Sequence, residues 1–137
     1  IENEDYYLEE SVKLSHQLAI VALYIKIELR IKTVCRLVFP ELNAALLCRF
    51  HYLKKKLKQR GIKIKDLPSF ASFDELRCIN NDIKHGGVVG EELAKYSDWT
   101  FKDDLTGIDD AYSRLAPGCA SFIKEFVEAI MANSRKS

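Results

Sequence analysis

The stretch Leu14–Val38, LSHQLAIVALYIKIELRIKTVCRLV, decides the fold. It belongs to a segment from about Asp5 to Phe39 that contains no glycine or proline. Apolar residues recur through it at helical spacing, so we predict one long first helix. They form two series, Leu14, Leu18, Val21, Ile25 and Leu29, and Ile20, Tyr24, Ile27, Ile31, Val34 and Val38. Because more than one face is apolar, we expect this helix to pack centrally or to be shared with a second subunit.

Proline and glycine divide the middle of the chain into two more helices. Pro40 ends or bends the first helix, because its ring disfavours a helical conformation in the residue before it. A second helix is predicted from Leu42 to Arg60, with Gly61 as its C-terminal stop and a loop over Ile62–Phe70. Ser72 precedes Glu75 by three residues, which is the capping-box spacing, so we expect the third helix to begin there. The glycines at 86 and 87 end it.

The last third of the chain predicts a loop and a final helix. A short helix is expected near residues 91–96. Thr106 and Asp109 repeat the capping spacing, and a helix should run from there to about Ala132, kinked at Pro117. Its predicted inward residues are Tyr112, Leu115, Cys119, Phe122, Phe126 and Ile130. No alternating strand pattern occurs, so we predict an all-α bundle of four or five helices forming a single domain over residues 1–137.

Composition excludes several classes of protein. The 21 basic and 20 acidic residues nearly balance, so net charge alone indicates no partner. The four cysteines lie far apart, which argues against a zinc site and favours reduced thiols in a cytoplasmic protein. The longest apolar run, Leu18–Ile25, is far shorter than the ~20 residues of a membrane span, and the acidic N-terminus does not resemble a signal peptide. We expect no membrane association, no metal and no cofactor.

Charge is nevertheless segregated along the chain. Residues 42–65 contain basic residues and no acid, whereas residues 91–110 are predominantly acidic. A basic helix end is what a nucleic-acid backbone requires, and a solvated helix end is the alternative explanation. His51 and Tyr52 could add stacking beside the lysines, or Tyr52 could pack against the first helix. The predicted RNA-binding residues are Lys54, Lys55, Lys56, Lys58 and Arg60.

One polar stripe on the third helix is the candidate for chemistry. At 100° per residue, Arg77, Asn81 and Lys84 fall within about 60° of one another, and His85 lies about 40° further round. A histidine beside two cations and an amide suits work on a phosphodiester, since imidazole moves protons near neutral pH and the cations oppose charge on the phosphorus oxygens. Alternatively, Asn81 and His85 cap the helix while Arg77 and Lys84 are surface charges.

The segment Asn80-Asn81-Asp82-Ile83-Lys84-His85-Gly86 resembles the signature of HEPN domains. In that family an Arg is followed by a polar residue, often Asn, and then by a His near a helix end. Here Asn81 and His85 match, Asn80 stands where Arg is expected, and Arg77 lies one turn earlier. The predicted catalytic residues are therefore Arg77, Asn80, Asn81, Lys84 and His85.

The resemblance implies a homodimer in which two motifs meet and cleave RNA without metal, through attack of the 2′-hydroxyl. Family members serve as toxins or as defence and stress nucleases, sometimes controlled by an antitoxin or another partner protein, and some are inactive binding modules. Two hypotheses are therefore open for this chain. It is either a metal-independent endoribonuclease or a non-catalytic dimerisation module that binds RNA or a protein partner. A regulatory bundle unrelated to nucleic acid is the third alternative.

Overall fold

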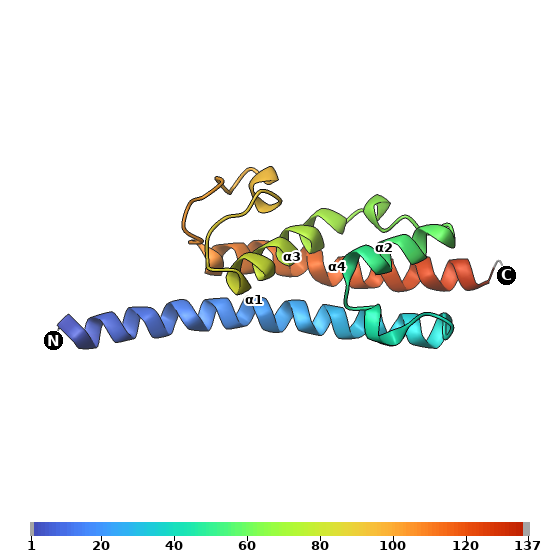
Figure 1. Ribbon diagram of the computed structural model, residues 1–137, viewed down its shortest axis with the longest axis horizontal. Coiled ribbons are helices and arrows are strands. Elements are labelled where there is room, and N and C mark those ends of the chain that lie inside the picture. The colour runs from blue at the N-terminus through green and yellow to red at the C-terminus, as the bar shows by residue number, and fades with distance from the viewer. Residues whose placement is uncertain (1, 136–137) are drawn as a thin grey trace.

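The computed structural model describes residues 2–135 as a bundle of four α-helices (Figure 1). The helices are α1 (Glu2–Val38), α2 (Phe50–Gln59), α3 (Phe70–Lys84) and α4 (Ile108–Ser134). Short 3₁₀ turns, η1 (Ala44–Leu46), η2 (Ile64–Asp66) and η3 (Leu93–Lys95), lie between them. Within the described residues the β-structure is a single bridge between Val88 and Asp104. The predicted all-α bundle with a long first helix is confirmed.

The two apolar series on α1 have different environments. Side chains of the series that begins at Ile20 are buried or half-buried and join the core. The series that begins at Leu14 lies on the opposite side, and most of it is exposed. The N-terminal end of α1 extends beyond the other helices (Figure 1). The helix therefore leaves an apolar face without a partner within the described chain.

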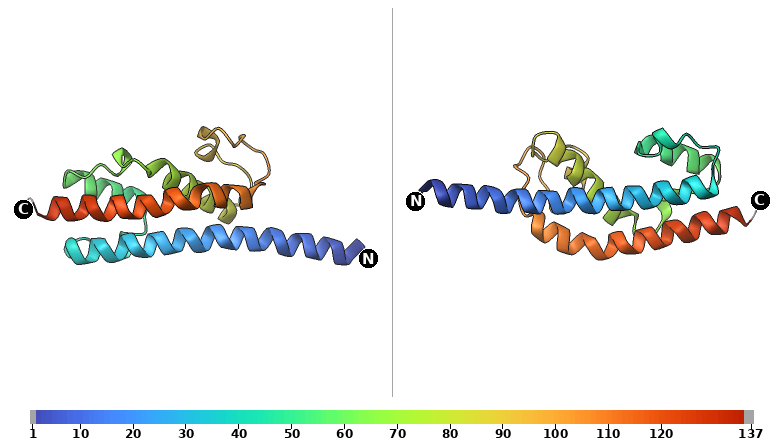
Figure 2. Two further views of the ribbon diagram at one scale, coloured as in Figure 1. Left: turned by 180° about the vertical axis from the view of Figure 1, so that it is seen from behind. Right: turned by 90° about the horizontal axis from the view of Figure 1, so that it is seen from below.

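The core lies where α1, α3 and α4 meet. Phe73 of α3 stacks on Phe122 of α4 with ring centroids 4.4 Å apart and an interplanar angle of 3°. The helix α4 continues through Pro117 and is curved, as the view from below in Figure 2 shows. Directly after the proline, Gly118 lies so close to Ser72 that a Cβ at position 118 would overlap its side chain. The predicted proline-containing last helix is confirmed, and Gly118 permits its close approach to α3.

Three predicted helix starts are wrong. The second helix does not begin at Leu42: Asn43 caps the turn η1 through its Oδ1, and α2 starts only at Phe50. The third helix begins before Ser72, and both the backbone N–H and the hydroxyl of Ser69 donate to the Glu125 carboxylate on α4. No side-chain cap forms at Thr106, because α4 begins after Gly107, whose φ is +67°.

Predicted helix ends are more accurate than predicted starts. Gly61 adopts a φ of +83° at the end of α2, and α3 ends at Lys84, before Gly86 and Gly87. The expected short helix near residues 91–96 is the 3₁₀ turn η3. Among the described residues, no helix is both long enough and apolar enough to cross a membrane.

The acidic and basic segments lie towards different ends of the bundle. The loop 85–107 packs near the start of α4, whereas α2 and η2 lie beside its C-terminal half (Figures 1 and 2). This arrangement agrees with the charge segregation read from the sequence. The α3 stripe and the lysine-rich α2–η2 region are therefore two separate surfaces.

Candidate functional site

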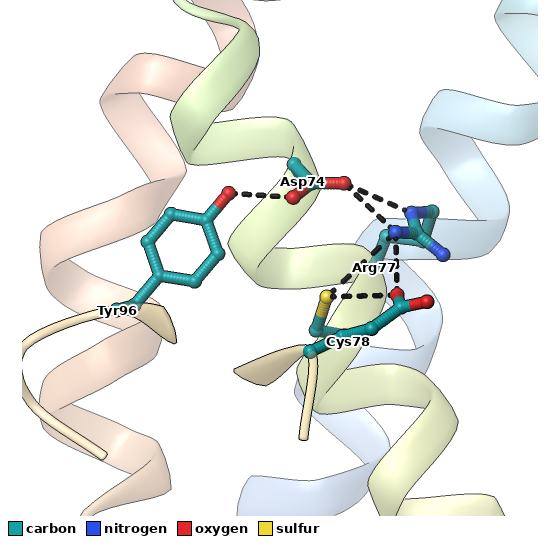
Figure 3. Close-up of polar contacts among 5 residues, drawn as sticks. Asp74, Arg77, Cys78 and Tyr96 are labelled. Atoms are coloured by element: carbon teal, nitrogen blue, oxygen red, sulfur yellow. Dashed lines mark hydrogen bonds and ion pairs between the residues drawn. The ribbon is translucent and has the colours of Figure 1, made fainter. Parts of the chain in front are cut away.

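Arg77 is held in place by contacts with Asp74, Cys78, Glu92 and Phe50 rather than exposed to solvent, and Figure 3 shows its contacts with Asp74 and Cys78. Its Nε and terminal nitrogen donate to Asp74 Oδ1 at 3.1 and 2.9 Å, and the terminal nitrogen also donates to Glu92 Oε2 at 2.9 Å. The guanidinium lies over the Phe50 ring, 4.5 Å from its centroid. Only 13% of its side chain is exposed. The two carboxylates therefore balance the positive charge of Arg77, which had been predicted to bind a phosphate.

Acidic side chains of α3 anchor the loop that follows the helix. The Tyr96 hydroxyl donates to Asp74 at 2.6 Å, and burial together with this hydrogen bond raises the pKa of Tyr96. The Gly90 N–H donates to Asp82 at 2.9 Å. Glu92, which pairs with Arg77, belongs to the same loop, and the hydrogen bond from Arg77 lowers the pKa of Glu92. One side of α3 is therefore occupied by contacts that fix the loop.

A second anchoring group surrounds the buried carboxylate of Glu75. Trp99 Nε1 donates to it at 2.9 Å, and both terminal nitrogens of Arg114 on α4 reach its two oxygens. Arg114 also pairs with Asp98 at 3.1 Å. The loop is thus attached to α3 and α4 together, and Glu75 has this structural role instead of the capping role predicted for it.

Asn80 is buried in the core. Its residue exposure is 1%, and neither its Nδ2 nor its Oδ1 has a hydrogen-bond partner among the described residues. Asn80 follows Leu76 by four residues, so both lie on the inward face of α3, which is turned away from the stripe. Asn80, which the sequence analysis included among the predicted catalytic residues, thus lies in the core and apart from the stripe formed by Arg77, Asn81 and Lys84.

The other stripe residues are only partly brought together. Arg77 and the half-buried Asn81 line one open cleft between the start of α2, the middle of α3 and residues 90–92, with a volume of about 710 Å³. Lys84 and His85 are exposed and lie outside the residues that line it. His85 is the C-terminal cap of α3, and its backbone N–H donates to the Asn81 carbonyl at 3.0 Å.

The histidine in this cleft is His51, not His85. His51 is exposed in the first turn of α2, beside Arg49 and Tyr52, and all three line the cleft. Cys48, Cys78 and the acids Asp82, Glu91 and Glu92 also line it. The sequence placed His51 beside the lysines, but it contained no signal that the start of α2 would line a cleft together with Arg77.

A separate groove of about 470 Å³ is formed by α2 and η2. The side chains that line it are Lys54, Lys55, Lys58, Lys63, Ile64, Lys65 and Asp66. We call this the lysine groove. Partial desolvation and the neighbouring ammonium group of Lys65 lower the pKa of Lys54. Within the described residues, none of these lysines is engaged in an ion pair with a carboxylate.

Two of the five predicted RNA-binding residues lie outside the lysine groove. The Lys56 ammonium lies over the Tyr52 ring, 5.6 Å from its centroid. Arg60 packs on the Phe39 ring and forms an ion pair with Glu41. The groove instead gains Lys63 and Lys65 from the loop after Gly61, and both belong to the basic run visible in the sequence.

All four cysteines are free thiols, and three of them, Cys35, Cys78 and Cys119, are buried. Burial raises the pKa of Cys78 to about 12 and that of Cys35 to about 11. Within residues 2–135 there is no cluster of three His, Cys, Asp or Glu side chains that could hold a metal ion.

Comparison with protein-family models, with curated proteins and with solved structures finds no significant match to this chain. The class that the fold defines is an all-α helical bundle.

Proposed function

We propose that this chain is an RNA-binding helical module that holds the phosphate backbone in the lysine groove. The observation that carries the proposal is the convergence of five lysines, from α2 and from the η2 segment, on one groove. Asp66 is the acid among the described residues that line it. The groove is therefore strongly cationic although the whole chain has a net charge of +1.

The electrostatics favour a polyanion as the ligand. Neighbouring ammonium groups repel one another, and the pKa of Lys54 is lowered first by partial desolvation and then by the nearby charge of Lys65. A phosphate backbone relieves the repulsion and releases its condensed counterions, which drives association. The resemblance of the α3 segment to HEPN domains supports RNA as the polyanion. Arg77 is already paired with two carboxylates, and Asn80 is buried. Both observations support a module that binds RNA without cleaving it.

Charge removal tests the groove. Lys54, Lys58, Lys63 and Lys65 are replaced by glutamine, and binding to a fluorescent single-stranded RNA is measured at several salt concentrations. Each lost phosphate contact should reduce the slope of log K against log salt by about 0.7. We expect the quadruple variant to bind at least about tenfold more weakly and with a flatter slope.

The matched control removes the same number of charges elsewhere. Lys13, Lys26, Lys95 and Lys124 are exposed and lie outside the groove. Their replacement by glutamine should leave the affinity within about twofold. Equal losses in both quadruple variants would show a nonspecific charge effect, and unchanged binding in the groove variant would reject the proposal.

A metal-independent endoribonuclease is the second candidate function. It is favoured by the exposed His85 at the end of α3 and by Arg77 and Asn81 sharing one cleft wall. His85 would transfer protons, Asn81 would orient the substrate, and Arg77 and Lys84 would bind phosphate. A dimer would bring two such stripes together. A role as a toxin or defence nuclease, with an antitoxin or other partner in the cytoplasm, belongs to this candidate.

Cleavage of total RNA or tRNA in excess EDTA separates the two candidates. The ribonuclease predicts products with the unmodified chain and none with His85→Ala. His51→Ala is the informative companion, because His51 is the histidine that lines the cleft with Arg77. Absence of cleavage, or equal cleavage by the unmodified chain and His85→Ala, would reject His85 as the catalytic residue.

A further inference from the structure

The charge of the lysine groove comes from two segments that the core holds in place. On α2, Lys54 and Lys58 are one turn apart, and each directly follows a buried leucine. On η2, Ile64 is 1% exposed, and Lys63 and Lys65 on either side of it are exposed. Since the side chains next to a buried residue point away from it, the core contacts of both segments keep these lysines at the surface where α2 and η2 meet. The cationic groove is therefore a fixed feature of the fold.

The groove is small, and its charge is high for its size. Its volume of about 470 Å³ lies in the lower part of the range of small-molecule sites, about 300–1,000 Å³. Five ammonium groups and the Asp66 carboxylate give the side chains that line it a net charge of +4. An internal RNA linkage carries a single negative charge, so a stretch of strand short enough for this volume would neutralise only part of that charge. A terminal phosphate carries about two charges and a 5′-triphosphate about four, which matches the groove.

The side chains that line the groove can recognise phosphate but not bases. Sites that follow a single strand combine basic residues with aromatic side chains on which the bases stack. No aromatic side chain is among the described residues that line this groove. Phe50 and Tyr52, the phenylalanine and the tyrosine of α2, line the Arg77 cleft instead. The groove therefore favours a compact group of phosphates over an extended strand.

From the size, charge and lining of the groove we propose that it binds the 5′-triphosphate end of RNA and leaves the following nucleotides outside. This inference rests on the proposed RNA-binding function and specifies which part of the RNA enters the groove. Lys54 and Lys58 approach the triphosphate from α2, and Lys63 and Lys65 approach it from η2. The selectivity is for the phosphorylation state of the end and not for the base sequence.

Three RNAs of one sequence test the selectivity for the end. They carry a 5′-triphosphate, a 5′-monophosphate or a 5′-hydroxyl together with a 3′ fluorophore, and fluorescence anisotropy measures their binding. We expect the triphosphate RNA to bind at least about tenfold more tightly than the hydroxyl RNA, with the monophosphate RNA between them. Equal affinities that all fall in the quadruple groove variant would overturn this inference and leave the proposed function standing. Equal affinities that the quadruple variant does not change would reject both.

Two double variants test whether the groove causes the selectivity. Lys54→Gln with Lys65→Gln should reduce the preference for triphosphate RNA to less than about threefold, because it removes one ammonium group from each side of the groove. The control, Lys56→Gln with Lys124→Gln, removes two charges outside the groove, one of them from α2, and should keep the preference. Equal preferences in the two double variants would overturn the inference, and circular dichroism checks that each variant is helical.

Inorganic tripolyphosphate distinguishes the end of an RNA from a free oligophosphate. It should displace the triphosphate RNA, but only at concentrations at least about tenfold above those of unlabelled triphosphate RNA, because it lacks the backbone charges that follow the end. Failure to displace the RNA would show that the triphosphate is not what the groove binds. Displacement at concentrations equal to or lower than those of the unlabelled RNA would make a free oligophosphate the ligand and overturn the assignment to RNA.

Discussion

Replacing Asn80 with leucine should stabilise the protein. The side chain is 1% exposed, and its amide nitrogen and oxygen have no hydrogen-bond partner among the described residues. Leucine carries the same number of heavy atoms beyond Cβ, so it can occupy the same volume on the inward face of α3. The substitution removes a buried donor and a buried acceptor and adds apolar contact.

The expected gain follows from the cost of an unsatisfied buried polar group. Mutational data place that cost at about 1–3 kcal/mol, so we expect the free energy of unfolding to rise by about 2 kcal/mol. For a chain of this size the midpoint of thermal unfolding should rise by roughly 6–10 °C. Urea unfolding provides the direct measurement, with a higher midpoint at an unchanged m-value.

The control is the neighbouring residue. Asn81 is half-buried at the cleft, so Asn81→Leu should change the free energy of unfolding by no more than about 0.5 kcal/mol. A loss of stability in Asn80→Leu would refute the reasoning, because it would mean that the amide makes hydrogen bonds that favour the native state. Since Asn80 does not reach the surface, RNA binding by Asn80→Leu should equal that of the unmodified chain.

Three further outcomes follow from the packing and from the buried ionisable groups. Gly118→Ala should lower the free energy of unfolding by about 1–3 kcal/mol, since the added methyl overlaps Ser72, and S72G/G118A should recover part of that loss in urea unfolding. In native protein Cys48 should be the one thiol that reacts rapidly with a disulfide reagent at pH 8, and all four should react in urea. Burial raises the pKa of Tyr24 to about 12 from an ordinary 10.0, so its contribution to stability is complete below pH 10 and falls as the pH rises towards 12. An unchanged urea midpoint between pH 9 and pH 11 would contradict this.

The sequence predicted the helices well because their periodicity is a local property. Both apolar series of α1 and the inward residues of α4 follow from spacing alone. Helix ends marked by Gly61 and by Gly86-Gly87 were found for the same reason, since glycine adopts the required backbone conformation. Helix starts were missed where distant contacts decided them. The Glu125 carboxylate that receives Ser69 lies 56 residues away, and no local pattern indicates it.

The candidate site was predicted less well. Helical spacing shows on which side of a helix a residue lies, but not which residues from other elements surround it. Spacing placed Arg77 and Asn81 on one side of α3, and both do line a cleft. It did not indicate that Asp74 and Glu92 would hold Arg77, or that Asn80 would lie in the core. The basic run was identified correctly as a segment, yet its members divide between two sides of α2. Only the fold shows that Lys63 and Lys65 complete a groove from which Lys56 and Arg60 are absent.

Glu92 offers the sharpest test of which surface carries RNA. Of the two carboxylates that pair with Arg77, Glu92 is the more accessible, because its side chain is 58% exposed and that of Asp74 is 18% exposed. Glu92→Gln removes one negative charge beside Arg77 and keeps the shape of the side chain. If the lysine groove binds RNA, the affinity should change by less than about twofold, because a single exposed charge outside the binding site is largely screened at physiological salt. Glu91→Gln, on the adjacent exposed residue of the same cleft, is the matched control.

An increase in affinity specific to Glu92→Gln that disappears when Arg77→Gln is added would place RNA at Arg77. That result would favour the ribonuclease over the binding module.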